Sequence, residues 1–168
     1  MNYEHFLKIA IEKSKESVAR GGFPVGAIIV KDGQVLASGI SNGKQQHDPT
    51  SHAEIAAIRE VCRKLHTRNL KDMTLYSSLE PCLMCFAACT WASIPRIVYA
   101  CGNNRVSQQH YEGVRDLSAV NTQIHHPIEL IHFSKYEDIA LKVIIDWEND
   151  LSSKAAPAKP MQDSHTTV

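Results

Sequence analysis

Two cysteines separated by two residues stand in the stretch LEPCLMC, residues 79–85. They are Cys82 and Cys85, and Pro81 comes directly before them. Such a pair fits a thiol–disulfide redox couple, half of a structural zinc site, or part of a catalytic metal centre. Pro81 is typical of the first turn of a helix, which places both sulfurs on one side of a helix start. The positive end of the helix dipole stabilises thiolates there.

A second segment supplies groups that would complete a catalytic zinc centre. Zinc in such a centre takes three protein ligands and keeps one position for water. His52 is the best candidate for the third ligand, and Glu54 would carry protons beside the metal-bound water. Ser51-x-x-Glu54 also matches a helix capping box, in which Glu54 would only satisfy a backbone N–H. The downstream Pro-Cys-x-x-Cys favours the metal interpretation.

The composition is that of an ordinary globular chain. Its 168 residues are 43% hydrophobic and 21% charged, which suits one domain with a single core. Lys plus Arg and Asp plus Glu number 18 each, and this balance disfavours a nucleic-acid polymer as the main partner. Five cysteines leave one over, so a disulfide framework is not indicated. No apolar run approaches the roughly 18 residues of a membrane span, and no signal-peptide core is present. We therefore expect a cytoplasmic protein without membrane association.

Helical and extended patterns alternate along most of the chain. Apolar spacing predicts helices over 3–19, 52–65, 81–92 and 135–149. Short apolar runs predict strands over 24–31, 35–40, 73–78, 95–101 and 128–133. Residues 41–50 read as a loop, and 102–126 is polar without a clear pattern.

This alternation is typical of an α/β layered domain, which we assign to residues 1–151. The tail 152–168 is rich in Pro, Ala and Ser, and we expect it to be disordered. In open α/β folds, ligands gather where loops enter helices at one edge of the sheet. The segments that contain His52 and Cys82 are therefore expected to be neighbours in space.

The two motifs together, His52-Ala53-Glu54 and Pro81-Cys82-Leu83-Met84-Cys85, form the signature of zinc deaminases. On these residues, and on PVGAIIV, HDPTSHAEI and LYSSLEPCLMC, the chain resembles the cytidine/deoxycytidylate-type zinc deaminases. The likeness covers roughly residues 1–101 and points to the nucleobase and tRNA-adenosine branches. It implies a three-layer α/β/α sandwich with a central mixed five-stranded sheet, a homodimer, and Zn²⁺ held by His52, Cys82 and Cys85.

The same resemblance implies a reaction and a pocket. Zinc-bound hydroxide attacks the ring carbon that bears an amino group, Glu54 moves protons to the ring nitrogen and the amine, and ammonia leaves. Asn42 matches the family's substrate-orienting asparagine, and the Ala53 backbone N–H would face a ring carbonyl. The remaining implied contacts are Val25 and Gly26 as pocket lining, the backbone of Leu79 and Glu80 as acceptors for the departing amine, and Trp147 as a cap.

The sequence resembles three branches of the deaminase family, which remove the amino group from different substrates. AIREVCRKL, LYSSLEPCLMC and Trp91-Ala92 resemble bacterial guanine deaminases, although those commonly have Pro-Phe-Gly where this chain has Pro24-Val25-Gly26. FPVGA and HDPTSHAEI resemble tRNA adenosine deaminases, yet CGNNRVSQQHYEG replaces their Lys-Thr-Gly-Ala-like stretch and no basic C-terminal helix follows. The acidic ending IIDWEND resembles fungal cytosine deaminases.

The missing tRNA motif, the zero net charge and the acidic last helix favour a free nucleobase or nucleoside, with guanine-like purines first. A tRNA-specific adenosine deaminase is the alternative, which would make tRNA a partner, and a cytosine deaminase is a further alternative. A non-catalytic zinc-binding module is a different class, and it would require a fourth Cys or His ligand in place of water.

Overall fold

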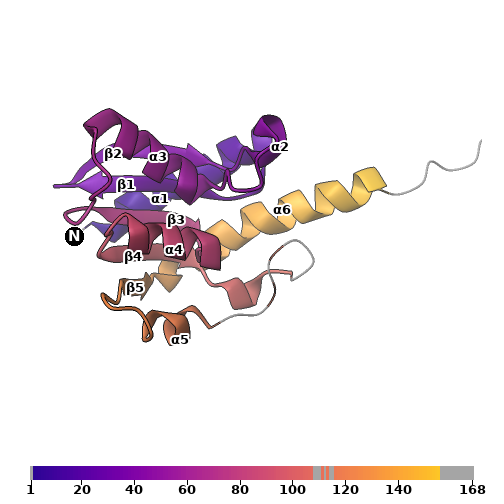
Figure 1. The fold of residues 1–168 in the computed structure, drawn as a ribbon. Helices are drawn as coiled ribbons and strands as arrows, with labels where there is room; N and C mark the ends of the chain where they lie inside the picture. Colours follow the sequence, from indigo (N-terminus) through magenta and orange to yellow (C-terminus); the bar gives the residue numbers. More distant parts are fainter. Residues whose placement is uncertain (1, 108–110, 112, 114–115, 156–168) are drawn as a thin grey trace, which may run out of the picture.

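Five strands form the central layer of the protein (Figure 1). The computed structural model describes residues 2–107, 111, 113 and 116–155, and its strands lie in the order β2-β1-β3-β4-β5. β1 (Gly26–Lys31) pairs antiparallel with β2 (Gln34–Ile40) and with β3 (Thr74–Leu79). β4 (Arg96–Cys101) pairs parallel with β3 and with β5 (Glu129–His132). The sheet is mixed, as predicted.

Helices cover both faces of this sheet. Ala27 and Ile29 of β1 pack into a core shared with α3 (Ala53–Leu65), α4 (Leu83–Trp91) and α5 (Leu117–Asn121). Ile28 and Val30 point to the opposite face and pack with α1 (Tyr3–Ala19) and α6 (Glu137–Ala155). This alternation follows from the two-residue period of a strand. The predicted three-layer α/β/α sandwich is confirmed.

Two glycines let helices approach the sheet closely. A Cβ on Gly39 of β2 would lie 1.9 Å from the Ala53 carbonyl oxygen at the start of α3. A Cβ on Gly26 of β1 would lie 2.3 Å from the Ser14 backbone nitrogen in α1. Neither position has room for a side chain, so both glycines fix the spacing between a helix and the sheet. Gly39 thereby sets the distance between the start of α3 and strand β2.

Most predicted elements are present, with shifted ends. α4 begins at Leu83 and not at Pro81, because Cys82 is its N-cap and its Sγ accepts the Cys85 backbone N–H. The predicted loop 41–50 contains the short helix α2 (Gly43–Gln46). The unassigned segment 102–126 contains a 3₁₀ turn, η1 (Asn103–Arg105), and the short helix α5.

The last helix is longer than predicted. After a 3₁₀ turn, η2 (Ser134–Tyr136), α6 continues past 149 to Ala155. Ion pairs Lys142–Asp146 and Lys154–Asp150 at i,i+4 spacing stabilise it. The helix thus extends into the first four residues of the expected tail, and residues 156–168 lie outside the described residues. Within the described residues, no helix has the length and hydrophobicity needed to cross a membrane.

Candidate active site

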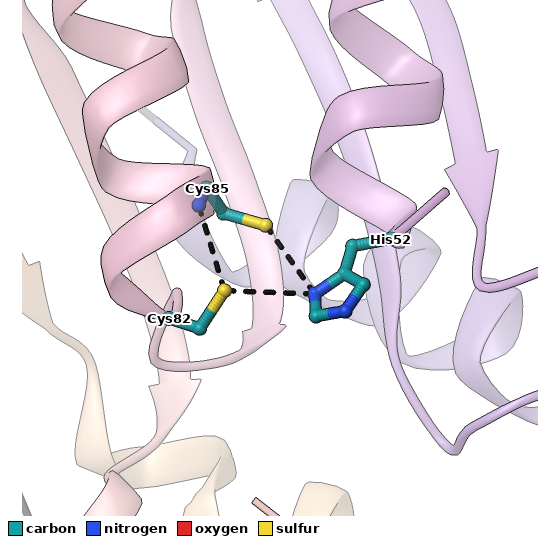
Figure 2. Close-up of side chains that lie close together, drawn as sticks. All are labelled: His52, Cys82 and Cys85. Carbon is teal, nitrogen blue, oxygen red and sulfur yellow. Dashed lines mark hydrogen bonds between the residues drawn. The ribbon is translucent and has the colours of Figure 1, made fainter. Parts of the chain in front are cut away.

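Two helix starts face each other at one end of the sheet (Figures 1 and 2). His52 immediately precedes α3, and Cys82 immediately precedes α4. Both residues have extended backbone conformations, so each side chain leaves its chain where a loop turns into a helix. Cys85 lies in the first turn of α4 and points toward the same centre (Figure 2). The two segments are neighbours in space, as expected.

Three donor atoms converge at this centre. His52 Nδ1 lies 3.5 Å from Cys82 Sγ and 3.6 Å from Cys85 Sγ. A tetrahedral zinc with Zn–S of about 2.3 Å and Zn–N of about 2.05 Å requires an S···N separation of about 3.6 Å. The three residues offer donor atoms that all lie within 4.8 Å of one another. The donor types and their spacing therefore fit a zinc ion held by two thiolates and one imidazole.

The Cys82 and Cys85 thiols have pKa values that are shifted in opposite directions. The hydrogen bond from the Cys85 thiol, followed by that from His52, lowers the pKa of Cys82 to about 4. The same contact with Cys82, together with burial, raises the pKa of Cys85. In the absence of metal, Cys85 therefore holds its proton more strongly than Cys82 does. A metal ion that binds both sulfurs must displace this proton.

Glu54 lies directly beside this cluster and is only 3% exposed. Its Oε1 accepts a hydrogen bond from Ser77 Oγ at 3.3 Å, and its Oε2 accepts one from Cys85 Sγ at 3.4 Å. Burial, followed by the negative charge of Cys82, raises the pKa of this carboxyl group. Glu54 is thus placed and tuned to hold a proton next to the metal-binding atoms.

The capping-box alternative is not realised. The N-cap of α3 is His52, and the Ser51 hydroxyl donates to Asn42 Oδ1, with Gln46 Oε1 3.1 Å away from the same hydroxyl oxygen. The Glu54 side chain turns inward to Ser77 and Cys85. Its position therefore serves the site and not the helix end.

A cavity of about 360 Å³ opens above the cluster. This volume lies at the lower end of the range for small-molecule sites. Ala53 is the first residue of α3, where backbone N–H groups have no intrahelical acceptor. The residues of the sequence prediction that line this cavity are Val25, His52, Ala53, Glu54, Leu79, Glu80 and Cys82.

Three predicted substrate contacts are not among the residues that line this cavity. Asn42 is half-buried next to the cavity-lining Ser41, and its Oδ1 is engaged by Ser51. Gly26 packs against α1, and its N–H donates to Ser78 Oγ at 3.1 Å, so its role here is packing. Trp147 is half-buried and lines an adjoining hollow, which shares Phe23, Ser41, Pro49 and His52 with this cavity.

Two aromatic side chains that the sequence did not indicate line the cavity. The Phe23 ring packs against Trp147 at a tilt of 40°, with ring centroids 4.9 Å apart, and it meets the Tyr111 ring edge-on at 6.3 Å. Trp147 therefore reaches the site through Phe23. Phe23 directly precedes Pro24-Val25-Gly26, and this family-like motif could have indicated that Phe23 lies at the pocket. Tyr111 lies in the polar segment 102–126, where no sequence pattern indicated a pocket residue. The other unpredicted lining residues are Ser41, Pro49 and Met84.

Two buried polar atoms occur near these rings. Tyr111 OH and Glu148 Oε1 have no hydrogen-bond partner among the described residues. Burial raises the pKa of Tyr111, and the negative charge of Glu148 adds to this effect. A buried carboxylate oxygen without a donor is costly, so Glu148 offers a free acceptor beside a cavity-lining residue.

Fold and site together are those of a zinc-dependent hydrolytic deaminase. The chain belongs to the family described as "Cytidine and deoxycytidylate deaminase zinc-binding region", whose sequence model matches residues 1–101. Zinc is therefore the cofactor that the family and the donor set indicate.

Similar proteins fall into two groups. A guanine deaminase of Bacillus subtilis (strain 168) is 42% identical over 113 residues, which is 67% of this chain and 72% of that protein. A tRNA-specific adenosine deaminase of Aquifex aeolicus (strain VF5) is 41% identical over 100 residues, 60% of this chain and 66% of that protein. The matches thus span about two thirds of these relatives. A solved structure of guanine deaminase from Bacillus subtilis has a TM-score of 0.63 at 34% identity and covers 89% of this chain and 95% of that one.

Proposed function

We propose that the protein removes an amino group from a free nucleobase or nucleoside, with guanine-like purines preferred. The observation that carries this proposal is the convergence of His52 Nδ1 on the Cys82 and Cys85 sulfurs at 3.5 and 3.6 Å, with the buried Glu54 carboxyl group beside them. Two helix starts and a strand must cooperate to build this arrangement. Functional side chains that converge from several separate elements are typical of a catalytic centre.

His52, Cys82 and Cys85 would hold the zinc ion. Bound zinc would supply Lewis acidity, lowering the pKa of a water molecule toward about 7. Among the described residues, the cluster contains these three residues and no fourth Cys or His. Three protein ligands leave a position open, whereas structural zinc sites are closed by four. The cluster therefore favours the enzyme over the non-catalytic zinc-binding module.

Glu54 would transfer the protons of the reaction. Its raised pKa favours the protonated form of the carboxyl group, which would give the proton to a ring nitrogen of the substrate. The same group would take up the protons that the attacking water releases and would deliver one of them to the departing amine. The Ala53 N–H would face a ring carbonyl, and backbone carbonyls at Leu79 and Glu80 would accept from the amine; all three residues line the cavity.

The cavity supports a small substrate over a tRNA. The relatives include both activities, so this preference rests on the aromatic rings of Phe23 and Tyr111 and on the acidic helix α6. The carboxylates of α6 would repel tRNA phosphates. The free acceptor on Glu148 suits a free purine base, whose imidazole ring carries an N–H donor that ribose replaces in tRNA adenosine. Wobble adenosine in tRNA is the alternative substrate, and cytosine is a further one.

A substrate panel tests this proposal. The zinc-loaded protein is assayed for ammonia release from guanine, adenine, cytosine, their nucleosides and a tRNA anticodon stem-loop. We expect release from guanine. Activity on the stem-loop alone would replace the proposal with the tRNA adenosine deaminase alternative. Activity on cytosine alone would replace it with the cytosine deaminase alternative. A protein that binds one zinc per chain and deaminates nothing would be the non-catalytic module.

We also propose that the protein works in the cytoplasm as a single domain over residues 1–151. The five cysteines are free thiols in the structure. The Cys82 and Cys85 thiols must stay reduced to bind metal, and a reducing compartment provides this condition.

A further inference from the structure

A tight turn, residues 102–106, connects β4 to the segment that carries Tyr111, and we call it the β4 turn. It contains η1, and its last residue, Val106, is buried in the same core cluster as Cys101 at the end of β4. Tyr111, which lines the cavity above the metal cluster, packs against this cluster. The position of the β4 turn therefore affects one wall of the cavity.

Two carboxylates from different elements hold the β4 turn. Glu80, which directly follows β3, accepts the Asn103 backbone N–H at 2.9 Å. Glu137, the first residue of α6, accepts the Gly102 backbone N–H at 3.3 Å. Hydrogen bonds to an ionised acceptor are stronger than those between neutral groups. The turn is thus fixed both to the end of β3 and to the start of α6.

Glu137 is held in place by two further side chains. Arg105 Nη1 lies 2.8 Å from its Oε2, and His132 Nε2 lies 3.2 Å from its Oε1. The His132 ring in turn stacks on Tyr99 of β4, with ring centroids 5.1 Å apart. The Glu137 side chain is only 14% exposed, so these contacts are partly shielded from water. One carboxylate therefore joins the β4 turn, β5 and α6.

We propose that Glu137 is a positioning residue, which acts through the β4 turn to place Tyr111 at the substrate. This inference rests on the proposed function, in which a nucleobase enters the cavity. Beyond the turn, the connection continues through Asn103 Nδ2, which donates to the Gly113 carbonyl oxygen at 3.4 Å, two residues after Tyr111. Glu137 itself is not among the residues that line the cavity. Its loss should therefore weaken substrate binding and spare the zinc centre.

An ordinary ion pair at a helix start is the competing interpretation. Arg105 also pairs with Asp138, the next residue of α6, at 3.5 Å. The Asp138 side chain is 91% exposed, and exposed ion pairs contribute little to stability. Asp138 is therefore a matched control, because it has the same charge, a neighbouring position and the same cationic partner. The hydrogen bond to the β4 turn belongs to Glu137.

Substitution of these two acids separates the two interpretations. Zinc-loaded Glu137→Ala should raise KM for guanine about 10-fold, equivalent to about 1.4 kcal/mol. It should keep one zinc per chain, and kcat should stay within about threefold of wild type. Asp138→Ala should change KM by less than about twofold.

Glu137→Gln provides a rescue, because the amide oxygen can still accept the Gly102 N–H, and its KM should return close to the wild-type value. Equal KM values in Glu137→Ala and Asp138→Ala would overturn the proposal. Glu137→Gln that is as impaired as Glu137→Ala would also overturn it, as would a folded Glu137→Ala that has lost its zinc.

Nitration of tyrosine by tetranitromethane tests the position of Tyr111 without a substrate. Burial raises the pKa of Tyr111, so a Tyr111 that is released toward solvent forms the reactive phenolate more readily. Peptide mass spectrometry of the zinc-loaded protein compares Tyr111 with Tyr3, a half-buried tyrosine of α1. We expect Tyr111 to be nitrated several times faster in Glu137→Ala than in wild type, and at the wild-type rate in Asp138→Ala.

The two readouts distinguish failure of this inference from failure of the proposed function. If the wild type deaminates guanine but Glu137→Ala changes neither KM nor the nitration of Tyr111, the positioning role is wrong and the proposed function stands. If the wild type deaminates no base but Glu137→Ala still exposes Tyr111, the proposed function is wrong and Glu137 nevertheless positions Tyr111.

Discussion

Cys85 Sγ lies 3.4 Å from Glu54 Oε2, a contact between two helices that start on opposite sides of the candidate metal site. Each residue is buried, and each affects the ionisation of the other. One would hold the metal and the other would move protons. The two roles can therefore be separated by substitution, although the side chains touch.

Glu54→Gln should abolish most turnover and keep the metal. The amide has the same shape and still accepts from Ser77, but it cannot exchange protons. Loss of a general acid–base group reduces kcat by about 10²–10⁴-fold. Ammonia release and zinc content are measured on the same sample. Turnover within a factor of about two of wild type would remove Glu54 from the proton-transfer step.

Two cysteines of α4 provide a matched pair for the metal. Cys85 points to His52, whereas Cys89, one turn later, is fully buried in the core. Cys85→Ser should lose zinc and activity together, because a hydroxyl is a poor zinc ligand. Cys89→Ser should retain one zinc per chain and lose only stability. Equal zinc content in both variants, measured by atomic emission, would exclude Cys85 as a ligand.

Zinc binding should release protons and weaken in acid. Cys85 holds a proton in the metal-free pair because its pKa is raised, and this proton must leave when both sulfurs bind. Calorimetric titrations of the metal-free protein in buffers of different ionisation enthalpy measure the number released. We expect at least one proton per zinc at neutral pH. A binding enthalpy that does not depend on the buffer would contradict this assignment.

The metal cluster could be predicted from sequence because each half is a local motif. His52 and Cys82 both stand at helix starts, and the sheet topology brings such starts to one edge. Glu54 was identifiable for the same reason. The upper part of the cavity was not, because Phe23 and Tyr111 come from loops whose positions depend on tertiary packing. Gly26 matched a family pattern, but its close contact with α1 is visible only in three dimensions.

Substitutions at Gly39 and Gly26 can distinguish the effect of helix packing near the site from that of packing far from it. An added Cβ would lie 1.9 Å from a backbone atom of α3 at Gly39, and 2.3 Å from one of α1 at Gly26. Both Gly→Ala variants should therefore lower the free energy of unfolding, by about 1–3 kcal/mol. Gly39→Ala should also weaken zinc binding, because α3 carries His52 and Glu54. Zinc affinity reduced equally in both variants would show that α3 is not selectively displaced.

The free carboxylate oxygen of Glu148 on α6 leads to a prediction about the substrate. Glu148 Oε1 is buried without a hydrogen-bond partner among the described residues, and its charge acts on the cavity-lining Tyr111. If it accepts an N–H from a guanine-like purine, Glu148→Gln should raise KM for guanine. A charge-assisted hydrogen bond of about 1.5–3 kcal/mol corresponds to a roughly 10–100-fold change.

Asp150→Asn is the control for this substitution, since Asp150 is an exposed acid of the same helix that pairs with Lys154. It removes the same charge from α6 without touching the buried acceptor, so KM for guanine should stay within about twofold of wild type. Steady-state kinetics on guanine and on its nucleoside measure both variants. If Asp150→Asn and Glu148→Gln change KM equally, the effect is the general charge of α6. An unchanged KM in Glu148→Gln would mean that the base does not reach this carboxylate.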